Sequence, residues 1–368
     1  MTQWPQWLPL NTGLRPLSPY GAPQVPADAV LNTNESPFAL SPELAKAIAA
    51  RVEVVATDLN RYPNRDANLL RSGLAEFVNS LSHTSFTLKN IWAANGSNEI
   101  IQSLFLAFGE KGAIGFTPSY SMHPLIARVT QTAWRDGQRR ADFSLDIEIA
   151  KEEIAKSAPS LTFITTPNNP TGTSISISEI EELARVAPGL LVVDEAYAEF
   201  SDEISAVTLI EKHPNVIVIR TMSKAFSFAG ARVGYLVADP VVIDALFLVR
   251  LPYHLSALTQ AAAEVALQYR EELLGNVATL IKSREWVAGE LNKLGLTVLP
   301  SKANFLLFSG FDIPAPLLWK SLLDAGVLIR DVGLSGYLRV TIGSEAENKL
   351  FIEALSKILV GAQDLQKS

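Results

Sequence analysis

The chain has 368 residues, of which 48% are hydrophobic and 19% are charged. This much apolar material can form a large core and argues against intrinsic disorder. The 38 acidic and 31 basic residues give a net charge of −7. That charge disfavours a nucleic-acid-binding protein, because neutralising phosphates requires an excess of Lys and Arg. Cysteine is absent, which excludes disulfides, thiolate metal sites and cysteine nucleophiles.

The composition also predicts a cytoplasmic protein with no membrane association. A chain without cysteine fits a reducing compartment. The first ten residues lack a basic region and contain two prolines, so we expect no secretory signal. The longest uncharged stretch, residues 157–178, holds three prolines and two asparagines. Its polar groups would be unpaired in a bilayer, so this stretch is not a transmembrane segment.

The first 37 residues are rich in proline and lack hydrophobic periodicity, which predicts an extended arm. Trp4 and Trp7 need to be buried, so we expect the arm to lie on a surface. The Ser-Pro-Glu sequence at 41–43 predicts the start of a helix. Serine caps the helix, proline suits its first turn, and the acid lies near the positive end of its dipole.

From residue 91 onward, short apolar runs alternate with amphipathic segments. Apolar strands separated by helical crossovers form parallel sheets covered on both faces, so this rhythm predicts an α/β domain with a mostly parallel central sheet. Such sheets bind ligands beyond the carboxyl ends of their strands, which makes the residues after each run the candidates for chemistry. The expected strands are 91–94, 113–116, 161–165, 190–193, 216–219 and 233–237.

The pattern changes after residue 240, where a long helical region at 258–294 precedes short strands and two further helices. This α+β layout predicts a second, smaller domain. We therefore expect an N-terminal arm, a large domain and a small domain formed by two separate stretches of the chain. The predicted bounds are 1–37 for the arm, 57–255 for the large domain, and 38–56 with 256–368 for the small domain.

Several common functional motifs are missing from the sequence. Neither G-x-x-x-x-G-K-[ST] nor G-x-G-x-x-G occurs, and there is no G-x-S-x-G nucleophile elbow. The histidines show no metal-ligand spacing, so we expect no metal site. We interpret each of them as a surface or structural residue: His83, His123, His213 and His254.

Polar segments follow four of the predicted strands. At 95–99, glycine and serine at a helix start can offer N–H groups to an anion, although a plain helix cap is the simpler interpretation. At 165–172, two asparagines between prolines form a rigid turn. Asp194 follows four apolar residues, and a buried carboxylate needs a cation or hydrogen bonds. Lys224 has small and apolar neighbours, where desolvation favours the neutral amine that can form a Schiff base.

Together, these groups are what a pyridoxal phosphate site requires. Such a site needs a lysine for the imine, an acid for the ring nitrogen, and phosphate donors at a helix start. Ser223 and Arg232 could add to the phosphate donors. Taken singly, each group also has a structural interpretation as a cap, a packing residue or a surface ion pair. Their joint occurrence at strand ends favours the cofactor site.

The motifs resemble those of fold-type I pyridoxal-phosphate aminotransferases, and specifically of the histidinol-phosphate aminotransferase family. The resemblance covers nearly the whole chain, and residues 20–24 and 250–256 look most like actinobacterial members. The matching motifs lie at 18–22, 31–37, 61–63, 95–99, 118–122, 167–172, 194–197, 223–226, 303–305, 328–330 and 338–343.

The resemblance implies a cofactor role for individual residues. Lys224 would form the imine with pyridoxal 5′-phosphate and later move the proton at the substrate Cα, while Asp194 would pair with the ring nitrogen. Asn169 and Tyr197 would hydrogen-bond the ring hydroxylate, and Tyr120 would stack on the ring. The cofactor phosphate would be bound by Gly96, Ser97, Asn98, Ser223, Arg232 and, from the neighbouring subunit of a homodimer, Tyr62.

The resemblance also implies how the substrate is held. Arg339 would bind the α-carboxylate as a bidentate pair. Tyr20, Asn34, Asn304 and Arg330 would surround the rest of the substrate. Two residues depart from the usual family pattern: Asn98 stands where many members have aspartate, and Ser36 replaces a more usual asparagine.

The implied reaction is transamination in histidine biosynthesis. L-Glutamate would give 2-oxoglutarate, and imidazole-acetol phosphate would leave as L-histidinol phosphate. An aromatic amino-acid aminotransferase, with phenylalanine or tyrosine as amino donor, is the alternative because it shares the whole catalytic set. A non-catalytic cofactor-binding regulator is disfavoured, since Lys224, Asp194, Asn169 and Arg339 are all present and no DNA-binding domain is attached.

Overall fold

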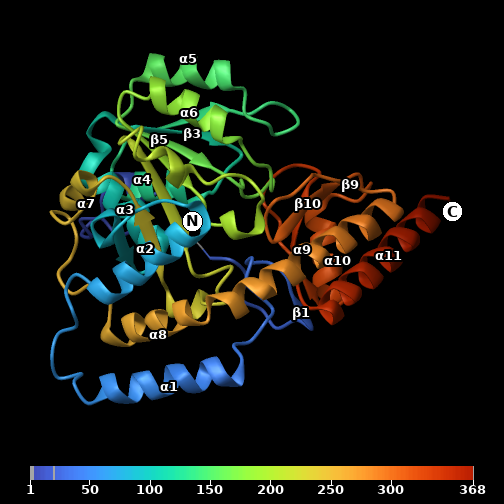
Figure 1. The fold of residues 1–368 in the computed structure, drawn as a ribbon. Coiled ribbons are helices and arrows are strands. Elements are labelled where there is room, and N and C mark those ends of the chain that lie inside the picture. The colour runs from blue at the N-terminus through green and yellow to red at the C-terminus, as the bar shows by residue number, and fades with distance from the viewer. Residues whose placement is uncertain (1–3, 20, 368) are drawn as a thin grey trace.

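The computed structural model describes residues 4–19 and 21–367. Figure 1 shows a large body around a central sheet and a smaller body at the C-terminal end, with the long helix α9 (Arg270–Lys293) running between them. The predicted α/β class, with a mostly parallel central sheet and a smaller α+β part, is confirmed. Among the described residues, no helix combines the length and the apolar character needed to cross a membrane.

The central sheet has seven strands in the order β2–β8–β7–β6–β5–β3–β4. Strand β8 runs antiparallel to both of its neighbours, whereas the other pairs are parallel. The strands are β2 (Ile91–Ala94), β3 (Ala113–Thr117), β4 (Trp134–Gln138), β5 (Leu161–Thr165), β6 (Leu190–Asp194), β7 (Val216–Thr221) and β8 (Gly234–Val237). Every residue of β5 and β7 is buried, which explains why these strands are mostly apolar in the sequence. The buried Arg220 of β7 is paired with Glu195.

Strand β4 has no counterpart among the predicted strands. It lies at the edge of the sheet, paired with β3, and its residues Arg135 and Asp136 are exposed. An edge strand that is partly open to solvent does not need an apolar run, so the sequence pattern that identifies the buried strands does not detect it.

Helices cover both faces of the central sheet. On one face, α3 (Ser97–Phe108), α4 (Met122–Val129) and α7 (Pro240–Leu246) pack on alternate strand residues such as Ile217. The other face, which includes Val218, is covered by α2 (Asn68–Ser82), α5 (Ile147–Ser157) and α6 (Ile177–Val186). Short 3-10 helices are η1 (Thr12–Leu14), η2 (Leu88–Asn90), η3 (Gly109–Lys111), η4 (Ala198–Phe200), η5 (Ala206–Leu209) and η6 (Ala229–Ala231).

The smaller body contains a second sheet. Strand β10 (Phe305–Ser309) pairs antiparallel with β9 (Thr297–Val298) and with β12 (Leu338–Thr341). Helices α9, α10 (Ala315–Asp324) and α11 (Glu345–Lys367) lie beside it. Strand β1 (Ala29–Val30) pairs in parallel with β11 (Val327–Leu328). The segment of residues 31–35, which follows β1, therefore leaves from the smaller body.

Helix α1 (Pro42–Ala56) begins as expected, because the Ser41 hydroxyl accepts a hydrogen bond from the Leu44 amide at 3.2 Å. It packs against α8 (Ala257–Gln268), and α8 in turn contacts α2 of the large body. Figure 1 shows α1 and α8 side by side, at a distance from β9 and β10. The domain bounds given above, including 38–56 in the small domain, stay a prediction.

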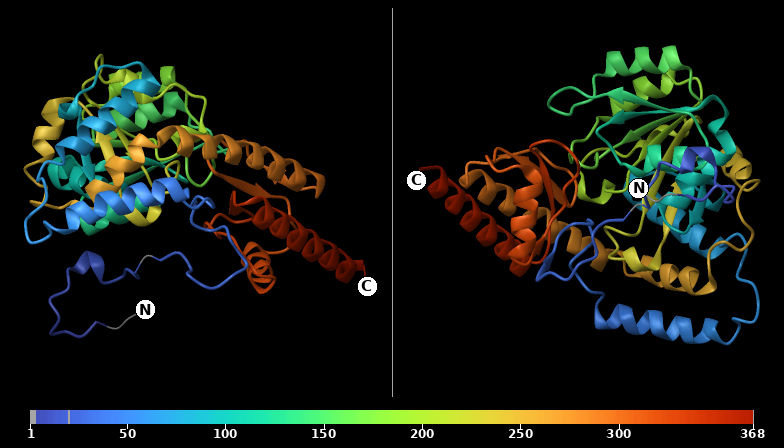
Figure 2. Two further views of the ribbon diagram at one scale, coloured as in Figure 1. Left: turned by 60° about the horizontal axis from the view of Figure 1, so that its bottom comes forward. Right: turned by 180° about the vertical axis from the view of Figure 1, so that it is seen from behind.

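In its described residues, the N-terminal arm runs without long helices or strands, as Figure 2 shows. The short helix η1 of the arm contacts α4 of the large body. The Trp4 indole donates a hydrogen bond to the Arg15 carbonyl at 3.2 Å. Trp4 nevertheless has 38% of its surface exposed and Trp7 has 79%, so the expectation that the two tryptophans are buried is wrong in the single chain.

The central sheet should be sensitive to cavities. Ile219 of β7 is fully buried, so Ile219→Ala is expected to lower the free energy of unfolding by about 2–5 kcal/mol. Val241→Ala is the control, because this α7 side chain is exposed and its loss should cost less than about 0.5 kcal/mol. Urea unfolding followed by circular dichroism measures both, and equal midpoints for the two variants would contradict the packing described.

Candidate active site

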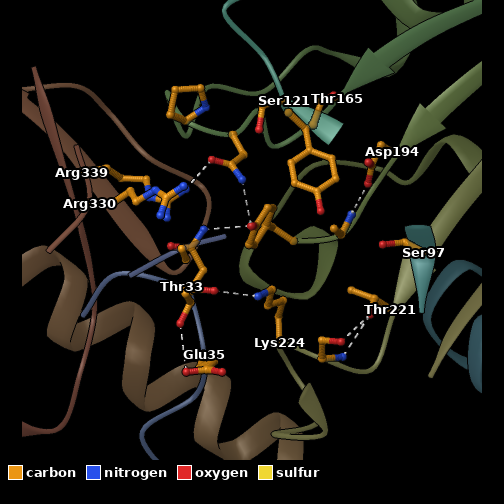
Figure 3. Close-up of a pocket in the computed structure, with 18 of the residues that line it drawn as sticks. Thr33, Glu35, Ser97, Ser121, Thr165, Asp194, Thr221, Lys224, Arg330 and Arg339 are labelled. Atoms are coloured by element: carbon orange, nitrogen blue, oxygen red, sulfur yellow. Dashed lines mark hydrogen bonds between the residues drawn. The ribbon is translucent and has the colours of Figure 1, made fainter. Parts of the chain in front are cut away.

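A cavity of about 350 Å³ lies beyond the carboxyl ends of the central strands. Figure 3 shows Lys224 at its centre, with Asp194 and Ser97 on one side and Arg330 and Arg339 on the opposite side. The cavity brings together most of the predicted site residues, namely Asn34, Ser97, Asn98, Tyr120, Asn169, Asp194, Tyr197, Ser223, Lys224, Arg232, Arg330 and Arg339.

Sheet topology explains this convergence. Strands β5, β6 and β7 are parallel neighbours, so their carboxyl ends meet at one edge. Asn169 follows β5, Asp194 is the last residue of β6, and Lys224 follows β7. The pairing of β1 with β11 delivers Thr33 and Asn34 to the same edge from the N-terminal side.

Asp194 is buried and is held by a residue that the sequence analysis did not assign to the site. Its Oδ2 atom lies 3.1 Å from Nε2 of the equally buried His123, and its Oδ1 atom accepts the Ala196 amide at 3.2 Å. The His123 ring packs 4.8 Å from Phe163 and edge-on to Tyr120. The interpretation of His123 as only a surface or structural histidine is therefore incomplete, since its ring orients a carboxylate that lines the cavity.

The Lys224 amine donates a hydrogen bond to the Thr33 carbonyl at 3.0 Å. Burial, and after it the charge of Arg339, lowers the pKa of Lys224 to about 8, although Glu35 acts in the opposite direction. Compared with an ordinary lysine, a larger share of this amine is neutral near pH 7. A neutral amine is the form that can attack an aldehyde.

A hydrogen-bond network joins the N-terminal segment to the strand ends. The Tyr197 hydroxyl accepts the Asn34 amide at 2.9 Å and the Asn169 amide at 3.4 Å. Asn34 has a φ of 56°, and Thr341 bonds both its backbone N–H and its side-chain oxygen. Asn304 lies behind this layer and donates to the Asn34 carbonyl at 3.1 Å, so its predicted substrate contact stays a prediction.

Two arginines form one wall of the cavity. Arg330 and Arg339 face each other in an antiparallel bridge, with N–O distances of 3.0 and 2.9 Å, which puts their side chains next to each other. The Arg339 guanidinium donates to Asn169 Oδ1 at 2.6 Å and to the Asn32 carbonyl at 2.7 Å. Two adjacent guanidinium groups favour carboxylate or phosphate ligands.

The opposite end has the features of an anion cradle. Gly96 has a φ of 81°, and a Cβ atom there would lie 2.6 Å from Arg232 Nη2. Helix α3 begins at Ser97 without a side-chain cap, so its first N–H groups can bind an anion. The Ser223 hydroxyl accepts from Arg232 at 3.5 Å and from Thr221 at 2.9 Å. Thr221 is the last residue of β7 and was not predicted, because the sequence carries no sign that its hydroxyl bonds Ser223.

The two departures from the family pattern have clear surroundings. The Asn98 side chain accepts a hydrogen bond from the Tyr120 hydroxyl at 3.1 Å, so it holds the predicted stacking residue. The Ser36 hydroxyl accepts from Ser227 at 2.8 Å and is not among the residues that line the cavity.

Three predicted residues within the described part of the chain do not line this cavity, namely Gly96, Asn304 and Tyr62. Tyr20 falls outside the described residues. Tyr62 has 79% of its surface exposed and stacks on Tyr253, with ring centroids 4.4 Å apart. Its predicted contact with a neighbouring subunit is a proposal that a single chain does not test.

Comparisons with known proteins identify the family. Residues 28–355 match the family model of class I and II aminotransferases. The histidinol-phosphate aminotransferase of Mycolicibacterium smegmatis is 52% identical over 351 residues, which cover 94% of this chain and 92% of that protein. The enzyme of the same name from Corynebacterium glutamicum is 52% identical over 355 residues, covering 96% and 97%.

Solved structures show the same fold. A histidinol-phosphate aminotransferase from Sinorhizobium meliloti, in complex with pyridoxal 5′-phosphate, aligns with a TM-score of 0.85 at 24% identity and covers 96% of this chain and 98% of that chain. A mutant aspartate aminotransferase from Thermus thermophilus aligns with a TM-score of 0.81 at 22% identity, covering 95% and 99%.

Fold and cavity together define a class I or II aminotransferase. Within that class, the identity over almost the whole chain shows that the protein belongs to the histidinol-phosphate aminotransferase family. The resemblance inferred from the motifs is thereby confirmed.

The Lys224 amine should titrate under the influence of Arg339. In cofactor-free wild-type protein, the rate of yellow-colour development after adding pyridoxal phosphate should rise with pH around the pKa of about 8. Arg339→Gln removes a cation that disfavours the ammonium form, so the midpoint should move to higher pH. An unchanged midpoint in stopped-flow absorbance would contradict this electrostatic coupling.

Proposed function

We propose that this protein is a pyridoxal-phosphate-dependent histidinol-phosphate transaminase of histidine biosynthesis. It would transfer the amino group of L-glutamate to imidazole-acetol phosphate, giving 2-oxoglutarate and L-histidinol phosphate. The observation that carries the proposal is a lysine with a lowered pKa that shares one cavity with a buried carboxylate, an anion cradle and two arginines.

The cavity residues fit the cofactor. When bound, pyridoxal phosphate supplies an aldehyde for an amine and an electron-poor ring that stabilises negative charge at the substrate Cα. Its phosphate would be held by Ser97, Ser223 and Arg232 and by the first N–H groups of α3. Gly96, the residue before Ser97, would contribute to the same phosphate site. Asp194, oriented by His123, would keep the ring nitrogen protonated, because a buried carboxylate is stabilised by a cation. Asn169 and Tyr197 would bind the ring hydroxyl, and Tyr120 would stack on the ring.

Lys224 would move the proton at the substrate Cα. A base works best when its pKa is near the working pH, and burial brings the pKa of Lys224 to about 8. The hydrogen bond to the Thr33 carbonyl holds the amine in the cavity. A carbonyl carries no charge, so this bond stabilises the ammonium form less than a carboxylate would.

The arginine wall suits both substrates of the proposed reaction. Glutamate carries an α-carboxylate, whereas histidinol phosphate has a phosphate ester one carbon from Cα and no carboxylate. Arg339 would bind the carboxylate of glutamate, and Arg330 would add the second cation that a phosphate dianion favours. Asn34, with Tyr20 and Asn304, would surround the remainder of the substrate.

We also propose a homodimer in the cytoplasm. Tyr62, Leu248 and Leu251 are all exposed, and Arg250, which lies between the two leucines in the chain, bonds to Arg65 and Asp66 of the loop that carries Tyr62. Exposed apolar side chains of this kind are typical of an interface. A second copy seated there could receive Tyr62 at its cofactor phosphate. The absence of cysteine supports a reducing compartment.

A half-reaction tests the chemistry. Mixing the cofactor-loaded protein with L-histidinol phosphate alone should convert the cofactor from its aldehyde form to its amine form, seen as an absorbance change. Lys224→Ala should slow this conversion by about 10²- to 10⁴-fold or more, because the proton carrier is lost. Lys89→Ala, which removes an exposed lysine, should react like the wild type. Absence of any conversion in the wild type would refute the substrate assignment.

Arg330 distinguishes the proposed function from the aromatic alternative. Arg330→Ala removes the cation proposed to bind the phosphate of the substrate. The KM for histidinol phosphate should therefore rise by about 10- to 100-fold, the range expected for lost hydrogen bonds to a charged group. The KM for phenylalanine, which has no phosphate, should change by less than about threefold. A wild-type preference for phenylalanine in steady-state assays would favour the aromatic aminotransferase instead.

A further inference from the structure

Tyr62 and Tyr253 form a stacked pair on the outside of the molecule. Their ring centroids are 4.4 Å apart and their planes differ by 15°. Tyr62 is 79% exposed and Tyr253 is 40% exposed. Because Tyr62 buries little of its surface, stabilising the fold does not account for its position.

The backbone of Tyr253 indicates that its position is determined by its surroundings. Its φ of 59° lies in the left-handed region, which bulky residues rarely adopt and which persists only where neighbouring contacts fix it. The next residue supplies such contacts. His254 Nε2 donates to the Ala93 carbonyl at 2.9 Å, and the Asn95 side chain donates to the His254 carbonyl at 2.8 Å.

Further bonds join this segment to the loop that carries Tyr62. Arg250 pairs with Asp66 at 2.9 Å and donates to the Arg65 carbonyl at 3.4 Å. Gln260 donates to the Asn64 carbonyl at 3.0 Å. The loop of residues 61–66 and the segment of residues 250–260 therefore form one connected unit, and the stacked pair is its exposed part.

We infer that Tyr253 is a positioning residue, whose ring holds Tyr62 in the orientation that serves the cofactor phosphate of a neighbouring subunit. This inference rests on the proposed homodimer and on the proposed role of Tyr62 in it. An exposed tyrosine without a neighbouring ring samples several rotamers, and fixing one of them on binding costs entropy. A stacked tyrosine is already fixed, so its binding costs less entropy. The unit is anchored through Asn95, the residue before the Gly96 loop of its own chain.

The test measures the dissociation constant of pyridoxal phosphate by titrating dimeric, cofactor-free protein. Tyr253→Ala should weaken binding by about two- to tenfold, which is the worth of one aromatic stack. Tyr253→Phe keeps the ring and should restore wild-type affinity. Trp286→Ala is the matched control, because it removes an aromatic side chain of α9 with a similar exposure, 41%, and should leave affinity unchanged.

A double-mutant cycle with Tyr62→Phe separates this inference from its premise. Tyr62→Phe alone should weaken cofactor binding. Unchanged affinity would refute the role of Tyr62, but it would not refute the proposed transaminase function, which the half-reaction of the wild type tests separately. In the Tyr62→Phe background, Tyr253→Ala should cause less than a further twofold loss. An undiminished loss there would overturn the inference, as would dissociation of the Tyr253→Ala dimer in sedimentation velocity at the concentrations used for titration.

Discussion

The site depends on a lysine amine that is hydrogen-bonded to a backbone carbonyl and forms no ion pair with a carboxylate of the described residues. Lys224 is desolvated at the edge of the central sheet, and its hydrogen-bond partner is the Thr33 carbonyl. Asp194 lines the same cavity, but its carboxylate is bonded by His123 and the Ala196 amide. An ion pair between the two would have stabilised the ammonium form. With separate partners, the amine can act on a carbonyl compound while the carboxylate is available to a ring nitrogen.

Topology makes that separation possible. Neighbouring parallel strands deliver one functional residue each to a common edge, at a spacing fixed by the sheet. The N-terminal segment closes the cavity from another direction, because β1 pairs with β11 and Asn34 is bonded to Thr341. The anion cradle and the arginine wall thus lie at opposite ends of one cavity, as Figure 3 shows, which suits ligands with two separate anionic groups.

Much of this could be predicted from the sequence, for physical reasons. Strands buried on both faces must be mostly apolar, so the sequence predicts β5, β6 and β7 and makes the residues at their carboxyl ends the candidates for chemistry. Strand β4 was missed because an edge position tolerates polar residues. His123 was missed because its partner lies 71 residues away, and a lone histidine in an amphipathic helix carries no sign of such a contact. The exposure of Trp7 could not be predicted either, since burial of an arm depends on what lies beside it.

The most direct test of this account is chemical. Reducing the cofactor-loaded protein with borohydride, followed by proteolysis and mass spectrometry, should find the cofactor covalently attached to Lys224 alone. Attachment to a different lysine, or a protein that takes up no cofactor, would contradict the assignment on which the site rests.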